Sequence, residues 1–227
     1  MPVPRLKHVA IAMLSMFMVL LISIALKAQP VIHLKGNVYE SWYDTDKKQP
    51  ILVKWTLTKE QVTCDNPKHR TGLDFKADKR VKPNTNFGRD YAHTVYDKGH
   101  LCPAADRECN GNWMDSTFLY TNCCLQRDKL NRNGWEYLER YTRAAAAIDG
   151  KVTVYAGGVF VGSWKRIGAD SLLLPVGFYK VIKRATGAYE IYYYDNAPCM
   201  DKPETHQITK DSLEKKVSHT VFFLIFN

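Results

Sequence analysis

The feature that most constrains the fold of this chain is one strong helix signal among several short β-branched and aromatic runs. The helix signal spans residues 131–148, ends at Gly150 and carries two acid–base pairs. Opposite charges four residues apart face each other on a helix, and glycine favours its end. The pairs are Glu136 with Arg140 and Glu139 with Arg143. One clear helix among strands indicates a single α+β domain with a central antiparallel sheet.

The β-branched and aromatic runs supply the strands of that sheet. Such runs between turn residues are typical of strands, and Thr186 and Gly187 mark a hairpin turn. We expect Gly157 and Gly158 to close the second strand in the chain. The expected strands are residues 51–57, 151–155, 172–182, 189–194 and 221–226.

The remaining segments set the domain boundaries. Residues 29–50 are polar and are predicted to form an N-terminal arm, and residues 58–95 are predicted to form a long irregular connection. The domain itself is predicted to cover residues 51–227. At 227 residues the chain is long enough to bury a core without help from a metal ion or a disulfide.

The N-terminus has the three parts of a secretory signal peptide. Arg5 and Lys7 precede an apolar run from residue 11 to 26, and Ala28 stands before a polar break. This run is sixteen residues long, is apolar apart from two serines, and is short for a membrane span, which needs about 20 residues. We therefore expect residues 1–28 to be cleaved and the protein to be exported, periplasmic or secreted. An uncleaved membrane anchor is the alternative.

The mature chain is moderately basic. The full sequence has 32 Lys+Arg against 23 Asp+Glu, a net charge of +9. Residues 1–28 hold three of the bases and no acid, so the mature chain is left with +6. A positive surface attracts polyanions such as nucleic acid, but charge alone does not choose among them.

Six cysteines all lie in the expected mature part. An even number in an exported chain favours disulfides, and six cysteines allow 15 pairings. Zinc is the competing interpretation. No C-x-x-C pair is present, and the adjacent Cys123 and Cys124 are a poor pair of ligands for one tetrahedral ion. We expect most of the six to be oxidised.

Two short segments carry candidate chemistry. The first reads DKGHLCP over residues 97–103 and the second begins with NCCLQ over residues 122–126. The second continues with NRNGWEYLE over residues 131–139, so His100 and Asn131 are 31 residues apart. Each fragment alone is weak evidence, but together at fixed offsets they are specific.

These segments resemble the DNA/RNA non-specific endonucleases of the ββα-metal superfamily, the group of endonuclease G-like and secreted sugar-non-specific nucleases. The family signature is Asp-Arg-Gly-His-x-x-Pro, then Asn-x-x-Pro-Gln, then Asn-x-x-x-Trp-x-x-x-Glu. The similarity continues at WTL, DFKAD, VYAGGVF and LPVGFYKV, and so runs from about Val38 to the C-terminus. The resemblance implies a ββα-metal nuclease motif within the domain.

The resemblance also assigns roles position by position. It makes His100 the general base and Asn131 the protein ligand of the catalytic Mg²⁺, with Mn²⁺ as another possible ion. Glu139 matches the acid that holds metal-bound water. Lys98 stands where the family has arginine, and we expect it to neutralise phosphate as a point charge, with slower turnover than arginine.

Three further residues are expected near the substrate. Asn122 and Gln126 match polar residues that order the site and bind substrate, although Leu125 stands at the family's proline position. Arg70 is the nearest candidate for a phosphate-binding arginine upstream of the DFKAD segment.

The residue types fit phosphodiester hydrolysis independently of the family. A histidine that is neutral near pH 7 can accept a proton from water, with Asp97 or a carbonyl to orient its ring. Mg²⁺ takes few protein ligands, so one amide oxygen from Asn131 is reasonable. The sequence therefore predicts an exported, Mg²⁺-dependent endonuclease that cleaves DNA and RNA with little sequence specificity.

Two other functions compete with this prediction. One is a catalytically weakened protein of the same fold that only binds nucleic acid or another polyanion, with Lys98 as the mark of decay. The other is a cysteine hydrolase that uses Cys102 beside His100. Residues two apart seldom meet in the required geometry, and export favours disulfides over free thiols.

Overall fold

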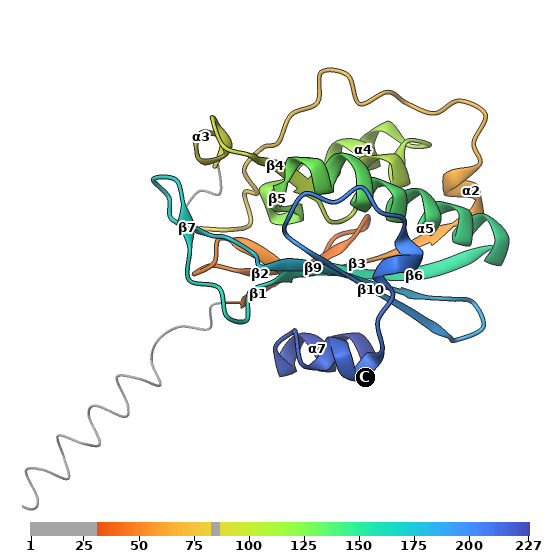
Figure 1. The fold of residues 1–227 in the computed structure, drawn as a ribbon. Helices are drawn as coiled ribbons and strands as arrows, with labels where there is room; N and C mark the ends of the chain where they lie inside the picture. Colours follow the sequence, from red (N-terminus) through yellow and green to blue (C-terminus); the bar gives the residue numbers. More distant parts are fainter. Residues whose placement is uncertain (1–30, 83–86) are drawn as a thin grey trace, which may run out of the picture. The chain divides into compact units, whose positions relative to one another are not determined.

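The computed structural model describes residues 31–82 and 87–227, which form one α+β unit around a six-stranded sheet (Figure 1). The sheet order is β1-β2-β3-β6-β9-β10, with every neighbouring pair antiparallel. This confirms the predicted fold class. The strands are β1 Val31–Leu34, β2 Glu40–Asp44, β3 Gln49–Thr58, β4 Tyr96–His100, β5 Cys123–Arg127, β6 Lys151–Val159, β7 Arg166–Ile167, β8 Leu172–Leu173, β9 Gly177–Lys183 and β10 Tyr189–Asp195. The expected signal peptide lies outside the described residues.

Helices cover both faces of this sheet, with α5 and the β4–β5 pair on one side and α7 on the other (Figure 1). The α-helices are α2 Lys59–Val62, α3 Gly88–Tyr91, α4 Gly111–Ser116, α5 Trp135–Asp149, α6 Lys210–Glu214 and α7 His219–Phe226. Short 3₁₀ turns are η1 Ala104–Arg107, η2 Tyr120–Asn122 and η4 Pro203–His206, and η3 Leu130–Gly134 is a π-helical turn. Within the described ranges, no helix is both long and apolar enough to cross a membrane.

Side chains of the central strands alternate between two cores, as the strand period of two requires. Val53 and Trp55 of β3 and Phe178 of β9 pack with α5 in the first core. Leu52 of β3 and Tyr179 of β9 point the other way and pack with α6 and α7. The sheet is thus buried on both faces.

The helix predicted for residues 131–148 is confirmed, and its first turn is the π-helical turn η3. Glu136 and Arg140 form the expected ion pair at 2.9 Å, and Gly150 ends the helix with a φ of 79°. Arg143, however, pairs with Asp106 at 3.2 Å rather than with Glu139.

Two expectations about strands are wrong at their boundaries. β6 does not close at Gly157 and Gly158 but runs through them to Val159. The strand expected over residues 172–182 is interrupted, because Pro175 has no N–H for a ladder hydrogen bond, and β9 begins only at Gly177.

Two expectations about the ends of the domain are also wrong. Residues 31–50 are not an irregular arm: they hold β1 and β2 at the edge of the sheet, where Tyr43 is fully buried. Residues 221–226 are not a strand but part of α7. Ser218 caps this helix, because its Oγ accepts the N–H of Val221 at 3.4 Å, and tertiary packing overrides the β-propensity of the apolar run.

The expectation that most cysteines are oxidised is wrong as well. Only Cys64 and Cys109 form a disulfide among the six. Cys123 and Cys124 are adjacent on β5, so their side chains point to opposite faces, and both are fully buried as small apolar groups. Cys102 is fully buried and Cys199 half-buried, and both are free.

Candidate active site

The β4–β5 hairpin and the turn before α5 build the candidate site. β4 carries the DKGH sequence and pairs antiparallel with β5, with His100 opposite Cys123. The π-helical turn η3 then carries Asn131, and Trp135 at the start of α5 donates its indole N–H to the carbonyl of His100 at 3.3 Å. Such π-helical turns occur frequently at functional sites.

Five of the seven predicted site residues line one cleft of about 350 Å³. Its floor and walls come from β4, η1, η3, α5 and the irregular segment before residue 75. The predicted residues in this cleft are Arg70, Lys98, His100, Asn131 and Glu139. A neighbouring cleft of about 570 Å³ shares Arg70, Lys98 and Asn131 with it. Residues far apart in the sequence therefore converge as the motif predicted.

His100 is held as a neutral imidazole. Its ring lies between Phe75 and Phe118, with centroids 4.6 and 4.8 Å away. Burial, and then the positive charge of Arg70, lower the pKa of His100 to about 3. Nε2 is buried and has no hydrogen-bond partner among the described residues, and the residue itself lines the cleft. A neutral ring can accept a proton.

Asp97, one of the two groups expected to orient the His100 ring, is hydrogen-bonded to Asn131 instead. The Nδ2 of Asn131 donates to Oδ2 of Asp97 at 2.9 Å. The guanidinium of Arg132 donates two hydrogen bonds to the same carboxylate, at 2.8 and 2.7 Å. Since Nδ2 is committed to Asp97, Oδ1 of Asn131 is left as the amide's free acceptor.

Lys98 is paired within the protein. Its Nζ donates to Oδ1 of Asp74 at 2.9 Å and lies 5.8 Å from the ring centres of Phe75 and Tyr120. Burial works to lower the pKa of Lys98, but the hydrogen bond and charge of Asp74 outweigh it and raise the pKa. The Asp74 side chain is 81% exposed, so an incoming anion can compete for this lysine.

Arg70 stands beside His100 at the mouth of the cleft. Its guanidinium lies 5.5 Å from the ring centre of Phe118, which also contacts His100. Its charge is the second cause of the lowered His100 pKa. Arg70 thus lines the cleft with His100, and its role in binding phosphate stays a prediction.

Glu139 is half-buried at the inner end of the cleft. Burial raises its pKa to about 7, while the nearby Lys180 opposes this shift. Lys180 itself is fully buried, with its Nζ 4.5 Å from the ring centre of Trp135. Burial lowers the pKa of Lys180, against the pull of Glu139. A buried lysine therefore lies close to Glu139 and Trp135 of α5.

Asn122 and Gln126 are fully buried and line neither cleft, so they suit the expected role of ordering the site, and substrate binding by them stays a prediction. Asn122 accepts the N–H of Cys102 and donates to its carbonyl, each at 2.9 Å, so it fixes the chain just after His100. Gln126 packs on Gly99, where a Cβ would come within 2.2 Å of its Oε1. The glycine of the motif is therefore needed for close packing.

The cysteine hydrolase is excluded by the position of Cys102. The thiol is fully buried and does not line the cleft. Burial raises its pKa to about 12, so it stays protonated near neutral pH.

Sequence reasoning missed the roles of several residues around the site. Asp74 was present in the DFKAD segment, but only the structure joins it to Lys98. Phe75 and Phe118 enclose His100 from two separate segments, and no local pattern marks that contact. Lys180 had a visible signal, because it is the one charged residue within the apolar run LPVGFYKV.

The donors present suit a hard divalent cation such as Mg²⁺. Oδ1 of Asn131 makes no hydrogen bond to the described residues, and the carboxylates of Glu136 and Glu139 line the same cleft. Mg²⁺ binds through oxygen donors and takes few direct protein ligands, which matches an amide oxygen flanked by carboxylates. The residues therefore fit the ion that the motif implies.

Comparison with known proteins identifies the class. A hairpin carrying His100, followed by a helix that begins beside Asn131, is the ββα arrangement on an antiparallel sheet. The profile of the DNA/RNA non-specific endonuclease family matches residues 26–224. The chain belongs to this family.

Individual relatives agree with that assignment. The chain is 29% identical over 184 residues to mitochondrial endonuclease G of Bos taurus, covering 74% of this chain and 61% of the relative. It is 28% identical over 205 residues to nuclease C1 of Cunninghamella echinulata var. echinulata, covering 81% of each. It covers 58% of the human endonuclease G and 48% of nuclease 1 of Schizosaccharomyces pombe, so it spans only about half to three fifths of several relatives.

A solved structure shares the fold. A crystal structure of the EndoG/EndoGI complex matches this chain with a TM-score of 0.74 and 26% sequence identity. The match covers 83% of this chain and 85% of the other. The central sheet and its helices are thus those of a known nuclease.

Proposed function

We propose that this protein is an endonuclease that hydrolyses phosphodiester bonds in DNA and RNA with Mg²⁺ bound through Asn131. The observation that carries the proposal is the cleft that joins neutral His100 to an Asn131 whose Nδ2 is held by Asp97. Family membership supports it.

His100 acts as the general base in this proposal. A water molecule between the base and the phosphate gives its proton to the neutral ring as its oxygen attacks phosphorus. The low pKa of the free protein keeps the ring unprotonated, and a bound phosphate anion favours the charged form and raises that pKa during the reaction.

Asn131 and Glu139 serve the metal. Oδ1 of Asn131 would hold the ion directly, and Glu139 would accept hydrogen bonds from the water around it. When bound, the ion neutralises negative charge that develops on the phosphate and helps the leaving oxygen. The Asp97 and Arg132 pair keeps the amide in one orientation, so no reorganisation is needed when the ion arrives.

Lys98 and Arg70 bind the phosphate. Lys98 exchanges Asp74 for a phosphate oxygen, which costs little because the aspartate is already solvated. Contacts to a phosphate carry no sequence information, so cleavage has little sequence preference and does not distinguish DNA from RNA strongly. Affinity falls with salt, because cations on the protein displace counterions from the substrate.

The test is cleavage of supercoiled plasmid DNA and of ribosomal RNA, each with Mg²⁺ and with EDTA. We expect both substrates to be cut in Mg²⁺ and neither in EDTA, with a smear rather than discrete fragments. A weakened protein that only binds nucleic acid would retard both substrates on a gel and cut neither, which would contradict the proposal. The same assay with Mn²⁺ in place of Mg²⁺ tests whether Mn²⁺ also supports cleavage.

We also propose that the protein is exported after removal of residues 1–28 and has no stable membrane association afterwards. The basic, apolar and small-residue parts of that segment support this, although several relatives carry mitochondrial names. Mass spectrometry of the protein from its host should give Gln29 as the first residue. An intact Met1 with no processed form would contradict export.

A further inference from the structure

Three metal-ligating side chains converge outside the cleft, on the segment that joins the end of β10 to η4. They are Cys199, Asp201 and His206, and one ligand atom from each lies within 4.8 Å of the others. None of the three lines either cleft. The Asp201 side chain is 69% exposed, so the cluster is accessible from solvent.

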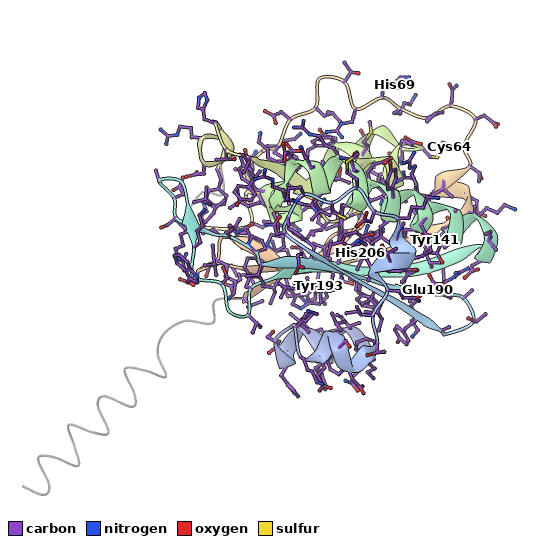
Figure 2. The ribbon with its side chains drawn as sticks, in the orientation of Figure 1. Cys64, His69, Tyr141, Glu190, Tyr193 and His206 are labelled. Carbon is purple, nitrogen blue, oxygen red and sulfur yellow. A yellow bond between two sulfur atoms is a disulfide. The ribbon has the colours of Figure 1, made fainter. Side chains whose placement is uncertain are left out.

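His206 is oriented by its backbone surroundings (Figure 2). Its Nδ1 lies 3.2 Å from the carbonyl oxygen of Tyr193, and its ring stacks on Tyr194 at a centroid distance of 3.9 Å. A carbonyl oxygen can only accept, so Nδ1 is the donor and the lone pair of the neutral ring is on Nε2. A histidine whose other nitrogen is fixed in this way is the usual arrangement at a protein-bound metal.

The other two side chains both approach that same Nε2. Sγ of Cys199 lies 3.4 Å from it and Oδ2 of Asp201 lies 3.7 Å from it, and the sulfur and the oxygen are 3.9 Å apart. Bond lengths to zinc of about 2.3 Å for sulfur and 2.0–2.2 Å for nitrogen and oxygen give tetrahedral edges of about 3.4–3.7 Å. The three observed separations are therefore close to those of one tetrahedral face.

A catalytic triad does not account for this geometry. In a triad the acid binds one ring nitrogen and the nucleophile binds the other. Here the thiol and the carboxylate face the same nitrogen of His206, and a carbonyl occupies the other. A single Nε2 cannot make a good hydrogen bond to both at once, whereas a cation between the three groups satisfies all of them.

We propose that Cys199, Asp201 and His206 bind one thiophilic divalent transition-metal ion of the zinc class, with water in the fourth position. Sulfur, nitrogen and oxygen donors together select Zn²⁺ or Co²⁺ over Mg²⁺ and Ca²⁺. The site is separate from Asn131 and does not depend on the nuclease function.

The location indicates what the ion does. The N–H of Gly134 donates to the carbonyl of Cys199 at 3.3 Å, and a Cβ on Gly134 would lie 3.0 Å from its Sγ. The metal-binding segment therefore packs on the π-helical turn that carries Asn131. A bound ion ties this turn to β10 through His206, and we expect it to stabilise that end of the active site.

The experiment is titration of the full chain with Co²⁺, without reductant so that the Cys64–Cys109 disulfide stays intact. Tetrahedral Co²⁺ bound to a thiolate gives a sulfur-to-metal charge-transfer band and visible d–d absorption. We expect one Co²⁺ per chain with both features and their displacement by one equivalent of Zn²⁺. Cys199→Ser and His206→Asn should abolish the charge-transfer band.

Two matched variants separate this site from the others. His219→Asn removes an exposed histidine elsewhere, and Asn131→Ala removes the proposed Mg²⁺ ligand, so both should keep the band at wild-type intensity. Absence of a band in the wild type, or a band that persists in His206→Asn, would overturn the proposal. A band that Asn131→Ala abolishes would overturn it too, because the ion would then belong to the cleft.

Discussion

The two faces of the central sheet are built from different kinds of residue. The face toward α5 holds apolar side chains together with the fully buried Lys180 and Asp106, and the half-buried Glu139. The face toward α6 and α7 is almost wholly apolar, with Leu213 and Ile225 packed on the strands. One sheet thus separates a surface that carries chemistry from a surface that supplies stability.

The difference between the two faces shows that a buried lysine is retained on the side that carries the candidate site. Burying Lys180 costs free energy, because its Nζ has no hydrogen-bond partner among the described residues. The rings of Trp55 and Trp135 and the nearby acids offset part of this cost. The other core is a cluster of apolar side chains from β3, β6, β9, β10, α6 and α7. We therefore expect substitutions on the α5 face to change activity, and substitutions on the α7 face to change stability alone.

The largest expected effect comes from substituting His100, which should change the cleavage rate and leave the fold intact. His100→Ala should lower the initial rate of plasmid cleavage by about 10²–10⁴-fold, because it removes the general base. His100→Asn fills more of the space between Phe75 and Phe118 and should be equally inactive. Circular dichroism should report an intact fold in both. His219→Ala is the control on an exposed histidine, and wild-type rates for the His100 variants would remove the assignment.

A paired leucine experiment tests the contrast between faces most sharply. Leu138 on α5 and Leu213 on α6 are both fully buried, so each change to alanine should cost about 2–5 kcal/mol of unfolding free energy. Leu213→Ala should leave the cleavage rate of the folded protein unchanged, whereas Leu138→Ala, next to Glu139, should also lower it. Urea unfolding and plasmid cleavage are the measurements; equal rates in the two variants would break the comparison.

The sequence predicted the chemical face better than the supporting one. His100, Asn131, Lys98 and Glu139 reach one cleft because a short hairpin and a helix start, both with local signals, carry them. The π-helical turn at Asn131 left no such signal. Its geometry depends on packing against Cys199 and on Asp97, which come from elsewhere in the chain.

The elements and residues that the sequence analysis missed all depend on tertiary contacts, which local sequence patterns do not record. α7 is rich in β-branched and aromatic residues, yet Ser218 caps a helix there because the sheet below presents an apolar surface. β1 and β2 are polar because they lie at the sheet edge, so their alternation is weak. Cys123 and Cys124 behave as core residues, which counting the cysteines of a sequence cannot reveal.

Substitution of Lys98 should have a smaller effect on the cleavage rate than substitution of His100, and it tests the phosphate role of Lys98. Lys98→Ala should lower the cleavage rate about 10- to 100-fold, the range of a hydrogen bond to a charged group. Lys98→Arg should preserve or raise the rate, since a guanidinium can bind the phosphate with two hydrogen bonds. The matched control is Lys76→Ala, which breaks a similar ion pair with Asp115 outside the cleft. If Lys98→Ala cleaves as fast as that control, Lys98 has no phosphate role.

A separate effect is expected on the pH dependence of stability. The folded pKa of His100 is about 3 and the unfolded value is about 6.5, so below pH 6.5 only the unfolded chain takes up this proton. This contribution is complete above pH 6.5 and is lost as pH falls, by about 1.4 kcal/mol per pH unit. His100→Gln should therefore lose less stability than wild type between pH 6.5 and 4, as measured by urea unfolding. Parallel curves would show that His100 is not buried in its neutral form.

The central claim is that Asn131 holds the catalytic ion, and the Mg²⁺ dependence of Asn131→Ala tests it most directly. Asn133→Ala is the control, because Asn133 lies in the same π-helical turn but binds the carbonyl of Lys129. Initial rates of plasmid cleavage are measured over a wide range of Mg²⁺ concentration. We predict that Asn131→Ala is nearly inactive at low Mg²⁺ and recovers partly at high Mg²⁺, while Asn133→Ala follows the wild type. A wild-type Mg²⁺ curve for Asn131→Ala would contradict the account.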